Sequence, residues 1–167
     1  MKKSALALVV IGLTLTGCKD FRSSRNEELD IEEIQYAIPQ GGEVFFEGHG
    51  LETWFAYGAM NGVDGAAANG VTQSQLFEDG YFLHTANVNI APAEDGYFYE
   101  GWIIKGSDVV STGHLSNYFG DSRHSVRFES DVDYTGYLNV VITLEPDDGD
   151  PSPAGHMVEG KLKITER

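Results

Sequence analysis

The chain has 167 residues, which is enough for one domain with a single hydrophobic core and a short additional segment. Its formal net charge of -15 makes it strongly acidic and disfavours binding to nucleic acid or to anionic lipid headgroups, because like charges repel. Its single cysteine excludes an intramolecular disulfide, so the stability of the fold must come from core packing.

The N-terminus has the features of a bacterial export signal, which we assign to residues 1–17. Lys2 and Lys3 form a positive start, and the apolar run 5–15 is too short to span a bilayer as a mature helix. Cys18 follows a small residue, at the position where a lipobox is cleaved. We therefore expect Cys18 to be lipidated, as by palmitate, and to anchor a lipoprotein in the membrane. An ordinary signal peptide beside an unrelated cysteine is the alternative.

The residue after the cysteine bears on where such a lipoprotein is sorted. By the enterobacterial rule, Lys19 in place of an aspartate directs the protein to the outer membrane. Because the rule varies between bacteria, two locations in the cell envelope stay open: the outer membrane and the periplasmic face of the inner membrane.

The segment 18–40 is polar and charged, and no hydrophobic period persists along it. Pro39 and Gly41-Gly42 then break any regular element. We interpret this segment as a flexible tether that lifts the folded domain off the membrane. In the alternative interpretation, its apolar residues pack on the domain.

Residues 41–167 form a series of short strand-like runs separated by turns rich in Gly, Asn, Asp and Pro. About seven to nine such runs follow one another, and no amphipathic helix of about ten residues interrupts them. The sequence therefore predicts an all-β fold, an antiparallel β-sandwich with immunoglobulin-like architecture. We expect any binding site in the turns 91–96, 105–108 or 145–153.

The aromatic stretch 97–106 is predicted to be a central strand, because both of its faces carry apolar side chains. Strand alternation places Phe98, Trp102 and Ile104 on one face. We expect this face to point into the core, with Trp102 packed against Val141.

Two residues of the same strand lead to separate predictions. Gly101, in the middle of the strand, predicts a bulge or a close approach of another chain segment. Glu100 shares the face of Trp102, and a buried carboxylate without a partner is costly. We therefore expect Arg123 or Arg127 to pair with Glu100.

Three stretches of the second half of the chain resemble a known family. They are Tyr99-Glu100-Gly101-Trp102-Ile103-Ile104-Lys105-Gly106, Ser111-Thr112-Gly113, and Ile142-Thr143-Leu144-Glu145-Pro146 with the following Gly149-Asp150-Pro151-Ser152-Pro153. Together they resemble the extracytoplasmic C-terminal domain of anti-sigma-K-factor-like proteins, over about residues 81–164. The resemblance implies a small all-β domain on the outer side of the cytoplasmic membrane.

The chain also departs from that family. The regulators carry a cytoplasmic sigma-binding helical domain and a transmembrane helix, and the lipobox stands where these would be. We therefore expect the chain to correspond to the outer domain alone and not to hold a sigma factor in the cytoplasm.

An acidic loop contains the best candidates for metal ligands, namely Asp147, Asp148 and Asp150, with Glu145 behind them. Calcium binds several oxygen atoms from one flexible loop, although the spacing and the distal glutamate of an EF-hand are missing here. We therefore expect no cofactor, and calcium is the alternative that stays open. The five histidines lack the spacing of a zinc site, which would have to assemble from distant strands.

No sequence pattern of an enzyme is found. Ser111, Ser116 and Ser125 lack a Gly-x-Ser-x-Gly elbow, and the glycine-rich segment 58–70 lacks the Lys-Ser/Thr of a phosphate loop. We therefore assign no catalytic residue and predict that the protein is not an enzyme.

The sequence as a whole predicts a membrane-anchored bacterial lipoprotein of the cell envelope, whose β-sandwich is a binding or interaction module. Its expected partners are the membrane, through Cys18, and an envelope protein, and nucleic acid is not one of them. The resemblance suggests a regulatory partner in an envelope-stress system as an alternative. The acidic loops suggest another, a calcium-dependent binding protein or hydrolase.

Overall fold

The computed structural model describes residues 42–166, so the predicted signal peptide, Cys18 and the 18–40 tether lie outside the described residues. Within residues 42–166 the chain forms ten strands and no helix, which confirms the predicted all-β fold. No helix in this range is long and apolar enough to cross a membrane. The strands are β1 (Phe45–Phe46), β2 (Gly50–Gly62), β3 (Asn69–Phe77), β4 (Phe82–Asn89), β5 (Tyr97–Lys105), β6 (Asp108–His114), β7 (Arg123–Ser130), β8 (Asn139–Pro146), β9 (Gly155–Lys161) and β10 (Lys163–Ile164).

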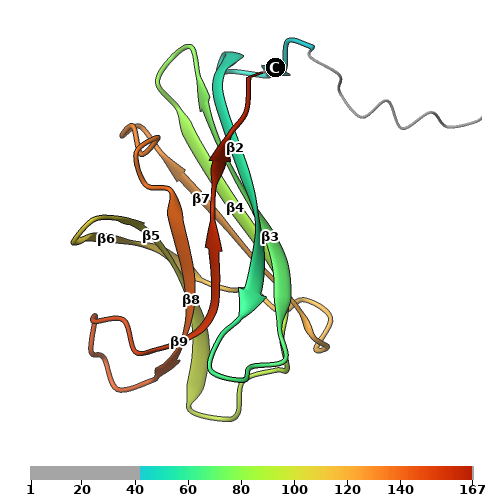
Figure 1. Cartoon of the computed structure of the whole chain (residues 1–167), viewed down its shortest axis with the longest axis vertical. Helices are drawn as coiled ribbons and strands as arrows, with labels where there is room; N and C mark the ends of the chain where they lie inside the picture. The colour runs from blue at the N-terminus through green and yellow to red at the C-terminus, as the bar shows by residue number, and fades with distance from the viewer. Residues whose placement is uncertain (1–41, 167) are drawn as a thin grey trace, which may run out of the picture. The chain divides into compact units, whose positions relative to one another are not determined.

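The strands form one antiparallel sheet in the order β6-β5-β8-β9-β2-β3-β4-β7, and β1 and β10 both pair with β2. The two ends of this order meet at an isolated bridge between Ser116 and Ser125. Ser116 N donates to Ser125 O at 2.7 Å, and Ser125 N donates to Ser116 O at 3.0 Å. The sheet is therefore curled into a nearly closed barrel, as Figure 1 shows, whereas the sequence predicted two separate sheets.

The core fills the inside of this curled sheet. Side chains that alternate along each strand supply it, as expected for strands with one face inward. Its buried members are Ala56, Met60, Phe82, Ala86, Val88, Ile90, Tyr99, Ile103, Val126, Val140, Ile142, Val158 and Leu162. Burial stabilises the fold by about 1.5–3 kcal/mol for each of the larger apolar side chains.

The orientation of β5 corrects one part of the sequence prediction. Trp102 is buried and lies opposite Val141, as predicted, and its Nε1 donates to Thr143 Oγ1 at 2.8 Å. However, the main buried cluster takes Tyr99 and Ile103 from the other face of the strand. Because both faces of β5 are apolar, strand alternation alone could not tell which face points into the barrel.

The predicted partners of Glu100 are wrong. Ser111 Oγ, on the neighbouring strand β6, donates to Glu100 Oε1. Arg123 pairs with Asp121, and Arg127 pairs with Glu129. The prediction matched opposite charges without knowing the strand pairing, in which β5 pairs with β6 and β8 while β7 pairs with β4.

Gly101 shows both features that its place in the strand predicted. The register between β5 and β6 shifts between Gly101 and Trp102, which marks a bulge. A Cβ atom at Gly101 would lie 2.4 Å from Thr112 Oγ1, so the position has no room for a side chain.

We expect Gly101→Ala to lower the free energy of unfolding by about 1–3 kcal/mol, because the added methyl group would overlap Thr112 Oγ1. Combining it with Thr112→Ala should recover part of this loss. Urea unfolding measures both effects, and Gly155→Ala is the control, since an added Cβ there meets nothing within 4 Å. Equal losses in the single and double variants would contradict the proposed overlap.

Candidate functional site

The outer face of β2, β3, β4 and β7 presents polar side chains in register. The strand pairing sets three rows across these strands: Asn61, Asn69, Asn89 and Arg123; Ala59, Val71, Asn87 and Ser125; and Tyr57, Gln73, Thr85 and Arg127. The side chains between these positions point the other way, into the barrel, where Thr72, Ser74 and His84 are buried. The next row along these strands, which contains Leu83, is covered from outside. Phe46 of β1 packs against the buried cluster to which Leu83 belongs.

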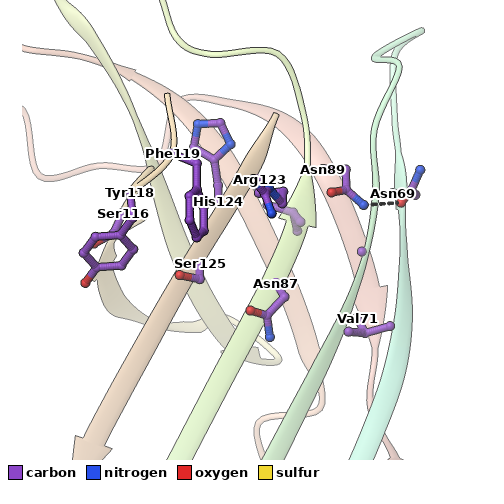
Figure 2. A pocket seen from close by; sticks show the side chains of 12 residues that line it. Asn69, Val71, Asn87, Asn89, Ser116, Tyr118, Phe119, Arg123, His124 and Ser125 are labelled. Carbon is purple, nitrogen blue, oxygen red and sulfur yellow. Dashed lines mark hydrogen bonds between the residues drawn. The ribbon is translucent and has the colours of Figure 1, made fainter. Parts of the chain in front are cut away.

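Three adjoining hollows open over these rows, with volumes of about 400, 580 and 420 Å³. Asn87 lines all three, while Gln73 and Thr85 line the second and third. Figure 2 shows the first hollow, with Ser125, Asn87 and Val71 across β7, β4 and β3. We call the three joined hollows the outer groove. Each has a volume typical of small-molecule sites, about 300–1,000 Å³.

The outer groove contains no carboxylate. The chain has 26 aspartates and glutamates, yet none is among the described residues that line the groove. The positive charges of its two arginines are balanced by carboxylates that do not line the groove. Arg123 Nη2 lies 2.6 Å from Asp121 Oδ2, and Arg127 Nε pairs with Glu129. Hydrogen bonds from Arg123 lower the pKa of Asp121, which keeps this pair charged. The groove is thus close to neutral in a strongly acidic protein.

Exposed aromatic rings stand at both ends of the groove. Tyr118 and Phe119, on the loop between β6 and β7, are 81% and 69% exposed, and Tyr57 on β2 is 52% exposed. The Arg123 guanidinium lies 4.0 Å from the Phe119 ring centroid, and Tyr57 stacks on Phe55. Apolar groups gathered around a groove in this way are typical of binding surfaces.

The loop that carries Tyr118 and Phe119 is fixed by hydrogen bonds. Asn117 Nδ2 donates to Asp121 O at 2.7 Å. His124 Nδ1 lies 3.0 Å from the carbonyl oxygen of Ser122, and His124 Nε2 lies 3.2 Å from Asn117 Nδ2. These hydrogen bonds tie the backbone of the loop to the start of β7, and Figure 2 shows Tyr118 and Phe119 beside that strand.

Several polar groups of the groove have no partner within residues 42–166. The side-chain amides of Gln73 and Asn87 make no hydrogen bond in this range, and Thr85 Oγ1 is shielded from solvent without a partner. Asn89 Nδ2 donates to Asn69 Oδ1 at 3.0 Å, which orients that amide pair across two strands. Polar groups of this kind are available to a ligand.

Inside the barrel, Ser74 and His84 form a pair that resembles part of a catalytic dyad. Ser74 Oγ lies 2.8 Å from His84 Nδ1, and both residues are buried. Burial lowers the pKa of His84 to about 4, so the ring is neutral at pH 7. Because core side chains surround the pair, we interpret it as part of the packing rather than as a nucleophile with its base.

The acidic loop after β8 uses its carboxylates to cap its own backbone. Asp148 Oδ1 accepts from Asp150 N at 2.9 Å, and Asp150 Oδ1 accepts from Ser152 N at 3.0 Å. Glu145 is buried and accepts from Ala154 N at 2.9 and 3.1 Å through its two oxygens, while Asp147 is exposed. Across residues 42–166, no group of three or more His, Cys, Asp or Glu side chains is arranged to hold a metal ion. Calcium binding by this loop stays a prediction.

The site predicted in the turns 91–96, 105–108 or 145–153 stays a prediction, and the sequence analysis did not point to the outer groove. Ser116 and Ser125, which line it, were weighed only as catalytic serines. One signal was available: residues 65–77 contain no charged residue, and neither do residues 80–93 apart from His84. Asn and Gln recur there at alternate positions, which strand alternation places on one face.

The comparison with known families agrees with the resemblance noted from the sequence. A family model described as anti-sigma-K factor rskA, C-terminal, matches residues 4–157, so the match begins far before the predicted range of 81–164 and ends within it. No curated protein and no solved structure matches the chain. The chain therefore belongs to the family of the C-terminal domain of anti-sigma-K factor rskA.

Proposed function

We propose that this protein is a lipid-anchored lipoprotein of the cell envelope whose β domain binds a ligand through the outer groove. One observation carries the binding role: a groove without carboxylates crosses four strands, although 20 of the 26 acidic residues of the chain lie within residues 42–166. Random placement of so many acids would leave a surface of this size charged, so its neutrality is a property of the site.

The rigidity of the groove supports binding as its role. Its floor consists of paired strands, and hydrogen bonds of Asn117 and His124 tie down the backbone of the loop that carries Tyr118 and Phe119. A site whose free and bound conformations are the same loses little free energy to ordering when a ligand binds. The free amides of Gln73 and Asn87 then supply direction and specificity.

The anchor is supported by the sequence alone. Cys18 follows a positive start, an apolar run and a small residue, which is the pattern of a lipobox. Each acyl CH₂ group buried in the bilayer contributes about 0.8 kcal/mol, and several chains together give stable attachment. The groove would then face the extracytoplasmic space.

Family membership favours one specific use of such a module. The matching family is named for an anti-sigma factor, a class of transcription regulators. A ligand-binding domain of that family on the outside of the membrane would report an envelope component to a regulatory partner. This regulatory role is the second candidate, and it is compatible with the binding role.

One complementation experiment tests these roles together. A deletion strain receives the wild-type gene, Cys18→Ser, or Val71→Asp combined with Asn87→Asp, which adds two carboxylates to the groove. We expect Cys18→Ser to leave the membrane fraction and the groove variant to stay in it. Only the wild-type gene should restore the transcript profile of the parent strain.

Each arm of the experiment can contradict one part of the proposal. Membrane association of Cys18→Ser equal to wild type would contradict the anchor. A groove variant that restores the profile as well as wild type would contradict a binding role for the groove. An unchanged profile in the deletion strain would contradict the regulatory role. Thermal melting of the purified groove variant controls for loss of folding.

A further inference from the structure

We infer that the ligand of the outer groove is a neutral glycan, an inference that rests on the proposed binding function. Three properties of the groove support it: the balance of its charges, the kind of hydrogen-bonding groups that it offers, and the position of its aromatic rings.

The charge of the groove favours a neutral ligand. Arg123 donates through both Nε and Nη2 to Asp121, at 2.9 and 2.6 Å, and Arg127 is paired with Glu129. An acidic ligand would compete with these carboxylates for the two guanidinium charges and would also meet the repulsion of a chain with net charge -15. A cationic ligand would find no carboxylate in the groove to pair with.

The hydrogen-bonding groups of the groove match hydroxyl groups. Every sugar hydroxyl both donates and accepts, and an Asn or Gln amide offers two donors beside an oxygen acceptor. Asn87 and Gln73 have their amides free within residues 42–166, and Ser125 adds a hydroxyl that donates and accepts. An apolar ligand such as an acyl chain would bury these groups unpaired, at a cost of about 1–3 kcal/mol for each.

The aromatic rings are placed where sugar rings can pack. A pyranose has an apolar C–H face, which packs on the face of a Tyr or Phe ring while the hydroxyls point outward to polar groups. Tyr57 lies on β2, and Tyr118 and Phe119 lie beyond β7, three strands away. Three spacings between strands give about 14 Å from β2 to β7, which is long enough for more than a single sugar ring.

A protein ligand fits the groove less well. The centres of protein interfaces are usually apolar and poor in unpaired polar groups. The middle row of this groove instead places Asn87 and Ser125 beside two small exposed aliphatic side chains, Ala59 and Val71. The free amides at the centre of the groove favour a ligand that is rich in hydroxyl groups.

The test uses the full lipidated protein, purified in detergent. Isothermal titration calorimetry measures binding of cellohexaose, maltohexaose and N-acetylchitohexaose, which are neutral, and of hexagalacturonate, which is acidic. We expect saturable binding of at least one neutral hexasaccharide and none of hexagalacturonate. Asn87→Ala, and Tyr118→Ala combined with Phe119→Ala, should each weaken binding at least tenfold. Val132→Ala, at an exposed position outside the groove, should bind like wild type.

Several outcomes would overturn the glycan inference. They are saturation by none of the neutral hexasaccharides, binding of hexagalacturonate as tight as that of a neutral one, and unchanged affinity in the groove variants. If no glycan binds but the groove variant still fails to restore the transcript profile, the proposed binding function stands with a protein as the ligand. If the groove variant also behaves as wild type in cells, both ideas fail.

Discussion

Replacing Trp102 with alanine is expected to lower the free energy of unfolding by about 3–5 kcal/mol. The indole is 5% exposed, lies opposite Val141, and donates to Thr143 Oγ1. Truncation would leave a cavity on this side of β5 and would remove the donor to a hydroxyl that is itself buried. Urea unfolding monitored by far-ultraviolet circular dichroism measures the loss.

Two further variants separate the contributions of Trp102. Trp102→Phe keeps an aromatic ring and removes the donor, so its cost should be smaller than that of the alanine variant. Tyr97→Ala changes a ring on the same strand that is 49% exposed, and its cost should be less than half as large. A loss for Trp102→Ala no greater than that for Tyr97→Ala would show that the indole is not packed as described.

Acidification is expected to destabilise the domain through His84. Burial lowers the pKa of this ring from 6.5 to about 4, so the unfolded state binds a proton more readily than the folded state between these values. The contribution of His84 to the free energy of unfolding is therefore fully present above pH 6.5 and is lost as the pH falls towards 4. A shift of this size corresponds to a loss of about 3 kcal/mol.

The measurement is urea unfolding of wild type and of His84→Gln at several pH values between 4 and 7. Gln does not titrate, so the variant should be less stable at pH 7 but should lose less stability on acidification than wild type. His114→Gln is the control for replacing a histidine at an exposed position, and it should change the pH dependence less than His84→Gln does. Parallel curves for wild type and His84→Gln would refute the role of His84.

The fold class could be predicted because it depends on local patterns. Short runs of alternating apolar residues between glycine-rich turns predict strands. The position of Gly101 in the middle of a strand predicted the bulge. The closure of the sheet was not predictable, because it depends on the contact between Ser116 and Ser125 at opposite ends of the strand order. Neither serine lies in an apolar pattern, so no local signal marks the bridge.

The site was harder to predict than the fold, because its residues come from separate strands. Asn87 and Gln73 look like ordinary exposed strand residues until pairing brings them onto adjacent strands. The acidic residues had a stronger local pattern, yet Asp148 and Asp150 hydrogen-bond to the backbone of their own loop. A candidate binding surface that is recognised by its lack of charged residues can be identified only when the strand order is known.

The bridge that closes the barrel also links binding to the integrity of the sheet. Ser116 and Ser125, which join its two ends through two hydrogen bonds, both line the first two hollows of the groove. A ligand that contacts both serines would bind the closed seam better than an open one, and would stabilise closure by RT ln(1 + [L]/Kd). Binding at this seam would therefore raise the free energy that is needed to separate the two ends of the sheet.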